Sequence, residues 1–132
     1  MPEPTRIARR WRVDDPRHLF AALAELHDAR VTSLEWRESG LFLRVDDVFS
    51  GFLGLPEYKG PLKGQLSFEP ATDLVVEIQP IAGPLAVYGI GVTQSAAGWT
   101  VDLAMAPGGR LKVVCDAVFV DFDPFEAIKS VQ

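Results

Sequence analysis

The chain has 132 residues, the size of one domain with its own hydrophobic core and too short for two. Its 13 Lys and Arg against 18 Asp and Glu give a net charge of −5, which argues against binding to nucleic acid or to an anionic membrane surface. No apolar run approaches the roughly 20 residues of a membrane helix, and the single cysteine excludes an internal disulfide.

The first residues, Met1 to Arg6, lack the apolar segment of an export signal. A lone cysteine is also typical of a reducing compartment. We therefore expect a cytoplasmic protein with a single domain over residues 1–132.

Residues 1–13 are predicted to be a basic arm or an edge strand. Ile7, Trp11 and Val13 share one face if this segment is extended. The arm also carries four arginines, which either touch phosphate locally or pair with the acidic remainder of the chain. The residues in question are Arg6, Arg9, Arg10 and Arg12 on the arm, with Asp116, Asp121, Asp123 and Glu126 as acidic partners.

Residues 14–30 are predicted to hold the only long helix. Asp15 suits the capping position, and Pro16 suits the first helical position. From there to Ala29, apolar side chains recur at helical spacing. The pattern predicts an amphipathic helix over residues 16–29.

From Val31 to Phe122 the apolar period changes to two, which is typical of half-buried strands. A turn at Pro70–Asp73 is expected to join two short strands, and short connections favour antiparallel neighbours. We therefore predict a mainly β fold, at the margin of α+β. It is either an antiparallel two-sheet sandwich or a flattened barrel of roughly seven or eight strands, with one N-terminal helix and a tail over residues 123–132.

The apolar register of these strands predicts the core. The side chains expected to be buried are Leu34, Trp36, Leu43, Phe68, Val76, Val101, Leu103, Val113 and Cys115.

The connection over residues 47–63 is unusually long and rich in large apolar side chains. Connections of this length without regular structure are often functional. One interpretation is a binding lip or a homodimer contact anchored by Phe52, Leu55 and Tyr58. The other is a flap that folds back and plugs an open end of the β-structure. The candidate interface comprises Phe49, Phe52, Leu53, Leu55 and Tyr58.

His27, followed by Asp28, is the one candidate polar site. It is either a general base held by the carboxylate or a partly buried histidine at the C-terminal end of the helix. Cys115 lies in an apolar register and is expected to be a core residue. We find no phosphate-binding glycine loop and no set of metal ligands, so we expect no cofactor and no metal.

Two stretches, Leu26 to Trp36 and Leu41 to Asp47, resemble a pattern in small bacterial β-rich proteins of unknown function. In that pattern a His-Asp-Ala step, here His27 to Ala29, leads into the first strand, and a strand ending in Asp-Asp follows. Some of these proteins look like immunity proteins encoded beside toxins. The resemblance covers residues 20–70 and implies a β-rich fold and a protein partner.

These observations favour a non-catalytic, cytoplasmic protein-interaction domain that either binds itself or, like the immunity proteins that it resembles, binds a protein partner. An alternative is a protein that binds a small apolar ligand in a cavity inside the β-structure. A second alternative is an enzyme that uses His27 with Asp28, which requires His27 to open into a cleft. The cavity of the first alternative would be lined by Trp36, Phe68, Trp99 and Phe119.

Overall fold

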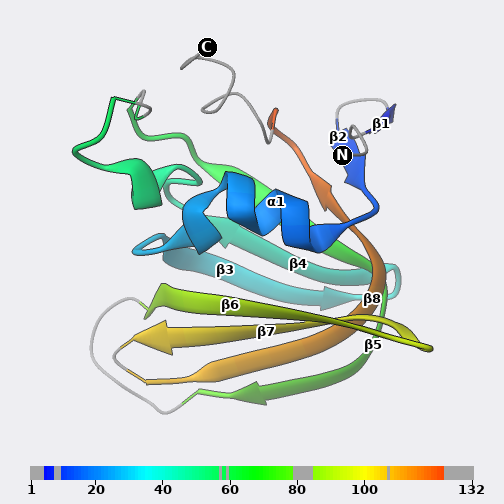
Figure 1. Ribbon diagram of the computed structural model, residues 1–132. Coiled ribbons are helices and arrows are strands. Elements are labelled where there is room, and N and C mark those ends of the chain that lie inside the picture. The colour runs from blue at the N-terminus through cyan, green and yellow to red at the C-terminus, as the bar shows by residue number, and fades with distance from the viewer. Residues whose placement is uncertain are drawn as a thin grey trace.

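Figure 1 shows a computed structural model of the chain, which describes residues 5–7, 10–56, 58, 60–78, 85–106 and 108–123. Its elements are β1 Thr5–Ile7, β2 Arg10–Val13, α1 Pro16–Ala22, η1 Ala24–Leu26, β3 Arg30–Arg37, β4 Gly40–Val45, η2 Ser50–Phe52, β5 Gly64–Glu77, β6 Leu85–Ser95, β7 Gly98–Ala106 and β8 Arg110–Val120. The predicted class, mainly antiparallel β with an N-terminal helix, is confirmed. The tail predicted at 123–132 falls almost wholly outside the described residues.

All strands belong to one antiparallel sheet, in the order β1-β2-β8-β5-β4-β3-β6-β7. Because β7 also pairs with β8, the strands from β8 to β7 form a closed ring. The ring is closed between β3 and β6 by only two residue pairs, Arg30 with Ala86 and Val31 with Leu85. We call this short junction the seam. Of the two architectures expected, the pairing is that of a flattened barrel.

The predicted turn at Pro70–Asp73 is wrong, because β5 runs through it as one strand. Its first part, from Gly64 to Phe68, lies between β4 and β8. Beyond Phe68 it pairs only with β8, with an irregular register between Thr72 and Val75. A proline is tolerated there because an edge strand does not need every N–H. The strand bends, so that its two halves lie in the upper and lower layers of Figure 1.

Helix α1 begins as predicted and ends earlier. The Asp15 carboxylate accepts a hydrogen bond from the Arg17 backbone N–H at 3.0 Å, and Pro16 occupies the first turn. The helix stops at Ala22 instead of Ala29, because the backbone of residues 28 and 29 forms hydrogen bonds with β6. The Asp28 N–H donates to the Val87 carbonyl, and the Val87 N–H donates to the Ala29 carbonyl. No helix in the described part of the chain is long and apolar enough to cross a membrane.

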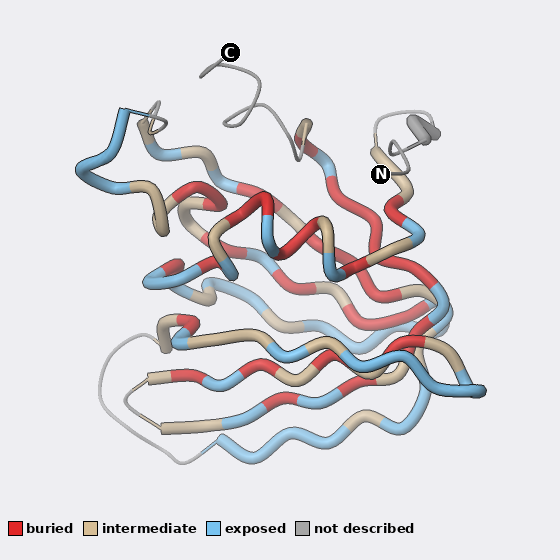
Figure 2. The backbone as a smooth tube through the Cα atoms, in the orientation of Figure 1, coloured by how far each residue is buried: buried red, intermediate tan, exposed pale blue. Residues whose placement is uncertain are grey.

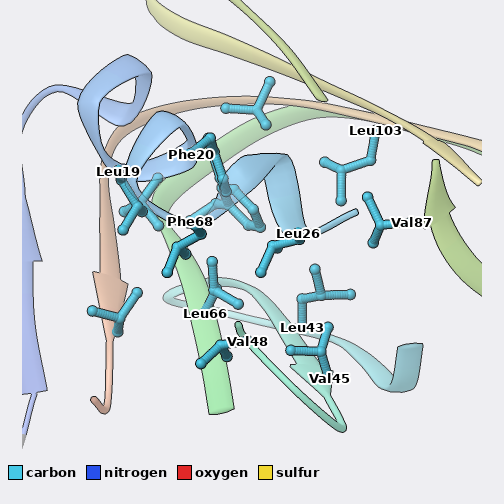
Figure 3. Packing of buried hydrophobic residues seen from close by; sticks show 14 of the residues in the cluster. Leu19, Phe20, Leu26, Leu43, Val45, Val48, Leu66, Phe68, Val87 and Leu103 are labelled. Carbon is cyan, nitrogen blue, oxygen red and sulfur yellow. The ribbon is translucent and has the colours of Figure 1, made fainter. Parts of the chain in front are cut away.

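The helix covers the inner side of the curved sheet and forms one core with it. Leu19, Phe20 and Leu26 come from the helical segment. Strands of both layers supply the other labelled side chains in Figure 3 except Val48, which follows β4. These contacts bury the side chains of Leu43, Val45, Val48, Leu66, Phe68, Val87 and Leu103.

Most of the predicted core is buried, but Trp36 and Val76 are 51% and 41% exposed and Leu34 is half-buried. The register itself is right, since Trp36 lies opposite buried Leu41 and Val76 opposite buried Leu111. Both residues lie where their strand has a neighbour on one side only. Alternation therefore predicts which face a side chain occupies, and not whether another element covers it.

The N-terminal arm forms the predicted edge strand in two short pieces, β1 and β2, which pair beside the end of β8. Arg10 forms an ion pair with Glu69, and its guanidinium lies 4.1 Å from the centre of the Phe119 ring. Arg12 pairs with Asp14. Thus the carboxylates that hold these two arginines are not those expected, and Glu126 lies outside the described residues.

We predict that Leu103→Ala lowers the free energy of unfolding by about 2–5 kcal/mol, because it leaves a cavity at a fully buried position. Chemical denaturation measures the change. The control is Leu53→Ala, the same truncation at an exposed side chain, which should change stability by less than about 0.5 kcal/mol. Equal losses in the two variants would contradict the packing described here.

Candidate functional site

Asp47 organises the long connection between β4 and β5. One carboxylate oxygen, Oδ1, accepts hydrogen bonds from the backbone N–H of Phe49 at 3.1 Å and of Leu62 at 3.2 Å. The other, Oδ2, accepts the Tyr58 hydroxyl at 2.7 Å. One carboxylate therefore ties together the start, the middle and the end of the connection.

Part of this connection is a plug. Phe49 is buried, and its ring lies 6.4 Å from that of Phe52 and 6.3 Å from that of Phe122, measured between centroids. Phe52 and Tyr58 are half-buried and pack against the core. Of the three anchors that the interface interpretation names, Phe52 and Tyr58 therefore already have contacts within the chain.

The tip of the connection remains uncovered. Leu53 is 72% exposed and Leu55 is 50% exposed. The tip follows η2 and forms the pale blue outer turn at the upper left of Figure 2. Of the five candidate interface residues, these two are therefore the ones available to a partner.

A strained turn lies beside this tip. Ala24, Glu25 and Leu26 have φ angles of 50°, 58° and 54°, a conformation that costs a residue with a side chain roughly 1–2 kcal/mol. The Ser50 hydroxyl donates to the His27 carbonyl at 2.7 Å. Gly51 lies so close to Ala24 that a Cβ at this glycine would be 2.6 Å from the Ala24 Cβ. The fold thus brings together the two sites that the sequence predicted separately.

His27 lies on the outer surface of this turn. Its Nδ1 is 3.0 Å from the Tyr88 carbonyl oxygen, which can only accept, so Nδ1 carries a proton. Its Nε2 lies 3.7 Å from Asp28 Oδ2. The His27 side chain is 51% exposed, because the helix ends at Ala22 and its apolar stripe does not continue to residue 27.

Tyr88 completes the surface and was not predicted as a site residue. It is 67% exposed, and its ring meets that of His27 edge-on with centroids 6.2 Å apart. It lies at the irregularity between Val87 and Gly89, where β6 departs from regular pairing with β7. We call Leu53, Leu55, His27 and Tyr88 the seam surface, after the β3–β6 junction beside which His27 and Tyr88 lie. The loop that carries the two leucines is joined to this turn through Ser50 and Gly51.

Neither the Ser50 hydroxyl nor the Cys115 thiol is activated as a nucleophile by the His27 imidazole. The Ser50 hydroxyl is bonded to the His27 carbonyl and not to its imidazole. Burial, with a smaller contribution from Asp116, raises the pKa of the Cys115 thiol to about 12, which keeps it protonated near neutral pH.

The four aromatic residues expected to line one cavity are spread over the molecule. Phe68 is fully buried in the core, and Trp36 is half-exposed at a sheet edge. Phe119 lies on the other face of the sheet from Phe68, beneath Arg10, and Trp99 lies beneath the Arg17 guanidinium. The larger hollows among the described residues are open. One of about 450 Å³ is lined by Glu77, Ile78, Gly108, Gly109 and Arg110.

The acidic residues of the described chain do not gather into a group of three or more side chains that could hold a metal ion. Asp46 and Asp121 instead accept hydrogen bonds from the backbone N–H groups of Arg30 and Gln65.

No protein-family model, no curated protein and no solved structure matches the chain.

The hydrogen bond from Tyr58 to Asp47 raises the pKa of the phenol above its ordinary value of 10.0, because ionisation would lose the bond and place two negative charges together. The contribution of this bond to loop stability is therefore present at neutral pH and is lost as the pH rises through the Tyr58 pKa.

We predict that Asp47→Ala lowers the Tyr58 pKa towards the ordinary value. Since the chain has 2 tyrosines, a Tyr88→Phe background lets tyrosinate absorbance report Tyr58 alone. Asp73→Ala, an acidic deletion in the bend of β5, is the matched control and should leave the titration unchanged. An identical midpoint in both variants would show that the Asp47 contact does not form.

A further prediction concerns the strained turn. Glu25→Gly should raise stability by up to about 1 kcal/mol, because glycine adopts a positive φ without steric cost. The matched control, Ala21→Gly on the exposed side of α1, should lower stability by about 1 kcal/mol. Thermal unfolding of the two variants compares them directly, and a loss of stability in both would rule out the left-handed turn.

Proposed function

We propose that this chain is a non-catalytic protein-interaction domain that binds a partner protein through the seam surface. The observation that carries the proposal is the exposure of Leu53 and Leu55 at the tip of a connection whose other apolar side chains are packed. Covering a leucine side chain completely stabilises a complex by roughly 1.5–3 kcal/mol.

The connection is held in place before any partner binds, which supports the proposal. Asp47 fixes it from within, while Ser50 and Gly51 fix it against the turn that carries His27. A surface ordered in advance loses less conformational entropy on binding. Strained backbone of the kind found at Ala24 to Leu26 also clusters at functional sites.

The chemistry of the seam surface suits a protein partner. Two leucines offer apolar contact area, and Tyr88 and His27 add aromatic rings with polar atoms. Of these residue types, tyrosine is enriched at the centres of interfaces. Asp28 and Glu25 are exposed beside them and would favour a partner with basic side chains.

The resemblance of residues 20–70 to small bacterial proteins, some of them immunity-like, covers the turn and the loop tip. A toxin neutralised by this chain is therefore the partner class to test first. The cytoplasm is the compartment we propose for such a complex.

The test uses the tagged full chain as bait in extract of the source organism. Leu53→Glu with Leu55→Glu should reduce retention of the partner at least about tenfold, since each change removes apolar contact and buries a charge. Val75→Glu, a similar change on the exposed part of β5, should retain it.

Three outcomes of this experiment are informative. A protein lost with the loop variant and kept by the control supports the proposal. Proteins lost equally from both variants, or from neither, contradict it. Retention of an untagged second copy through the loop tip would identify the partner as the chain itself.

A further inference from the structure

The second half of β5 is an uncovered strand edge. From Ala71 to Glu77 the strand pairs with β8 on one side, and no other strand of the described chain pairs with its opposite side. It forms the bottom edge of the sheet in Figure 1 and is mostly exposed in Figure 2. Such an edge presents a row of N–H and C=O groups that only another extended strand satisfies completely.

The side chains along this edge are apolar on both faces. Val75 and Val76 are 45% and 41% exposed, and Ile78 just beyond the strand is 40% exposed. Leu74 packs partly against the core. Edge strands of soluble proteins usually carry lysine, proline or inward-pointing charge that prevents pairing. Here Asp73 and Glu77 are the charged residues of the edge, and both are acidic.

We propose that this edge pairs antiparallel with the same edge of a second copy, about a two-fold axis at Val76. Directly opposed residues of an antiparallel pair point to the same face of the sheet. A two-fold axis perpendicular to the continued sheet therefore lies between one residue and the same residue of the second copy, which pair with each other. The positions of the charged residues and the irregular stretch of β5 together select which residue that is.

An axis at Val75 would place Asp73 directly opposite Glu77 of the second copy, and an axis at Glu77 would place two glutamates face to face. Like charges directly opposite are destabilising. An axis at Val76 avoids both contacts. An axis at Leu74 avoids them too, but it places Val76 opposite Thr72 and centres the pairing on the irregular stretch between Thr72 and Val75. The axis at Val76 places Val76 opposite itself and Leu74 opposite Ile78 of the second copy, so that apolar side chains meet on the inner face.

The outer face fits the same register. Val75 lies opposite Lys112 of its own chain, and Glu77 opposite Arg110. With the axis at Val76, Glu77 of the second copy lies beside Val75. The row of side chains across the junction then begins with Lys112 and Val75 of one copy and continues with Glu77 and Arg110 of the second. Each Glu77 therefore lies in a row that has a basic side chain at both ends.

The expected complex is a weak, concentration-dependent dimer. About this axis the described residues from Leu74 to Ile78 pair with the second copy over roughly 17 Å. The buried area therefore falls below the roughly 1,200 Å² of a small stable interface. The pairing uses no residue of the seam surface, so this inference stands independently of the proposed function.

Sedimentation of the full chain over a range of concentrations tests the proposal. The wild type should change from monomer to dimer as concentration rises. Val76→Lys places two ammonium groups at the axis and should weaken association at least about tenfold with an unchanged melting temperature. Leu53→Lys, the same kind of change on the seam surface, should leave association unchanged.

Oxidative cross-linking tests the register and does not depend on the lysine variant. Val76→Cys should form a covalent dimer through its self-paired thiols, because opposed Cβ atoms lie about 4.5–5.5 Å apart. Ile78→Cys should not form a covalent dimer, because residue 78 lies opposite Leu74 of the second copy and far from residue 78 of that copy. The native Cys115 is buried and is present in both variants, so it does not account for a difference between them.

A wild type that remains monomeric at every concentration overturns the proposal, as does a dimer that survives Val76→Lys. Loss of the dimer in Leu53→Lys would move the contact to the seam surface and overturn the proposal too. If Val76→Lys does not fold, the cross-linking decides: a covalent dimer of Ile78→Cys in preference to Val76→Cys refutes the register.

Discussion

The architecture depends on the continuous pairing of β8. Along one edge it bonds to β5 from Arg110 to Val120, and along the other it bonds first to β7 and then to β2. Strands β2, β5 and β7 therefore pair with β8 directly, and β4, β3 and β6 are joined to it through β5 and β7. Because β5 and β8 bend together, the sheet curls around helix α1 and encloses a single core.

The ring closes weakly at the point opposite β8, and the candidate site lies there. Two residue pairs join β3 to β6, and backbone hydrogen bonds between Val87 and residues 28 and 29 extend that junction. The chain must leave α1, cross the seam and enter β3 within a few residues. That requirement accounts for the left-handed turn, which in turn presents His27 to solvent. A structural constraint and an exposed surface thus share the same residues.

The candidate site was only partly predictable. The density of large apolar residues between Asp47 and Lys63 identified the loop, and the His27–Asp28 pair identified the turn. Asp47 was not among the predicted site residues, although its oxygens hold the loop together. An acidic residue between a strand and a loop that contains a tyrosine was the available signal. Nothing around Tyr88 pointed to it, because its position depends on pairing between segments distant in sequence.

Local chemistry in the sequence determined the element types, the helix start at Asp15–Pro16, the antiparallel class and most of the core. Each of these follows from neighbouring residues, through capping, proline geometry and apolar period. Tertiary structure decided where the helix stops, that β5 continues past Pro70, and that Trp36 and Val76 remain exposed. These outcomes depend on which strand lies alongside or which element lies above, and a residue's own neighbours in sequence do not specify that.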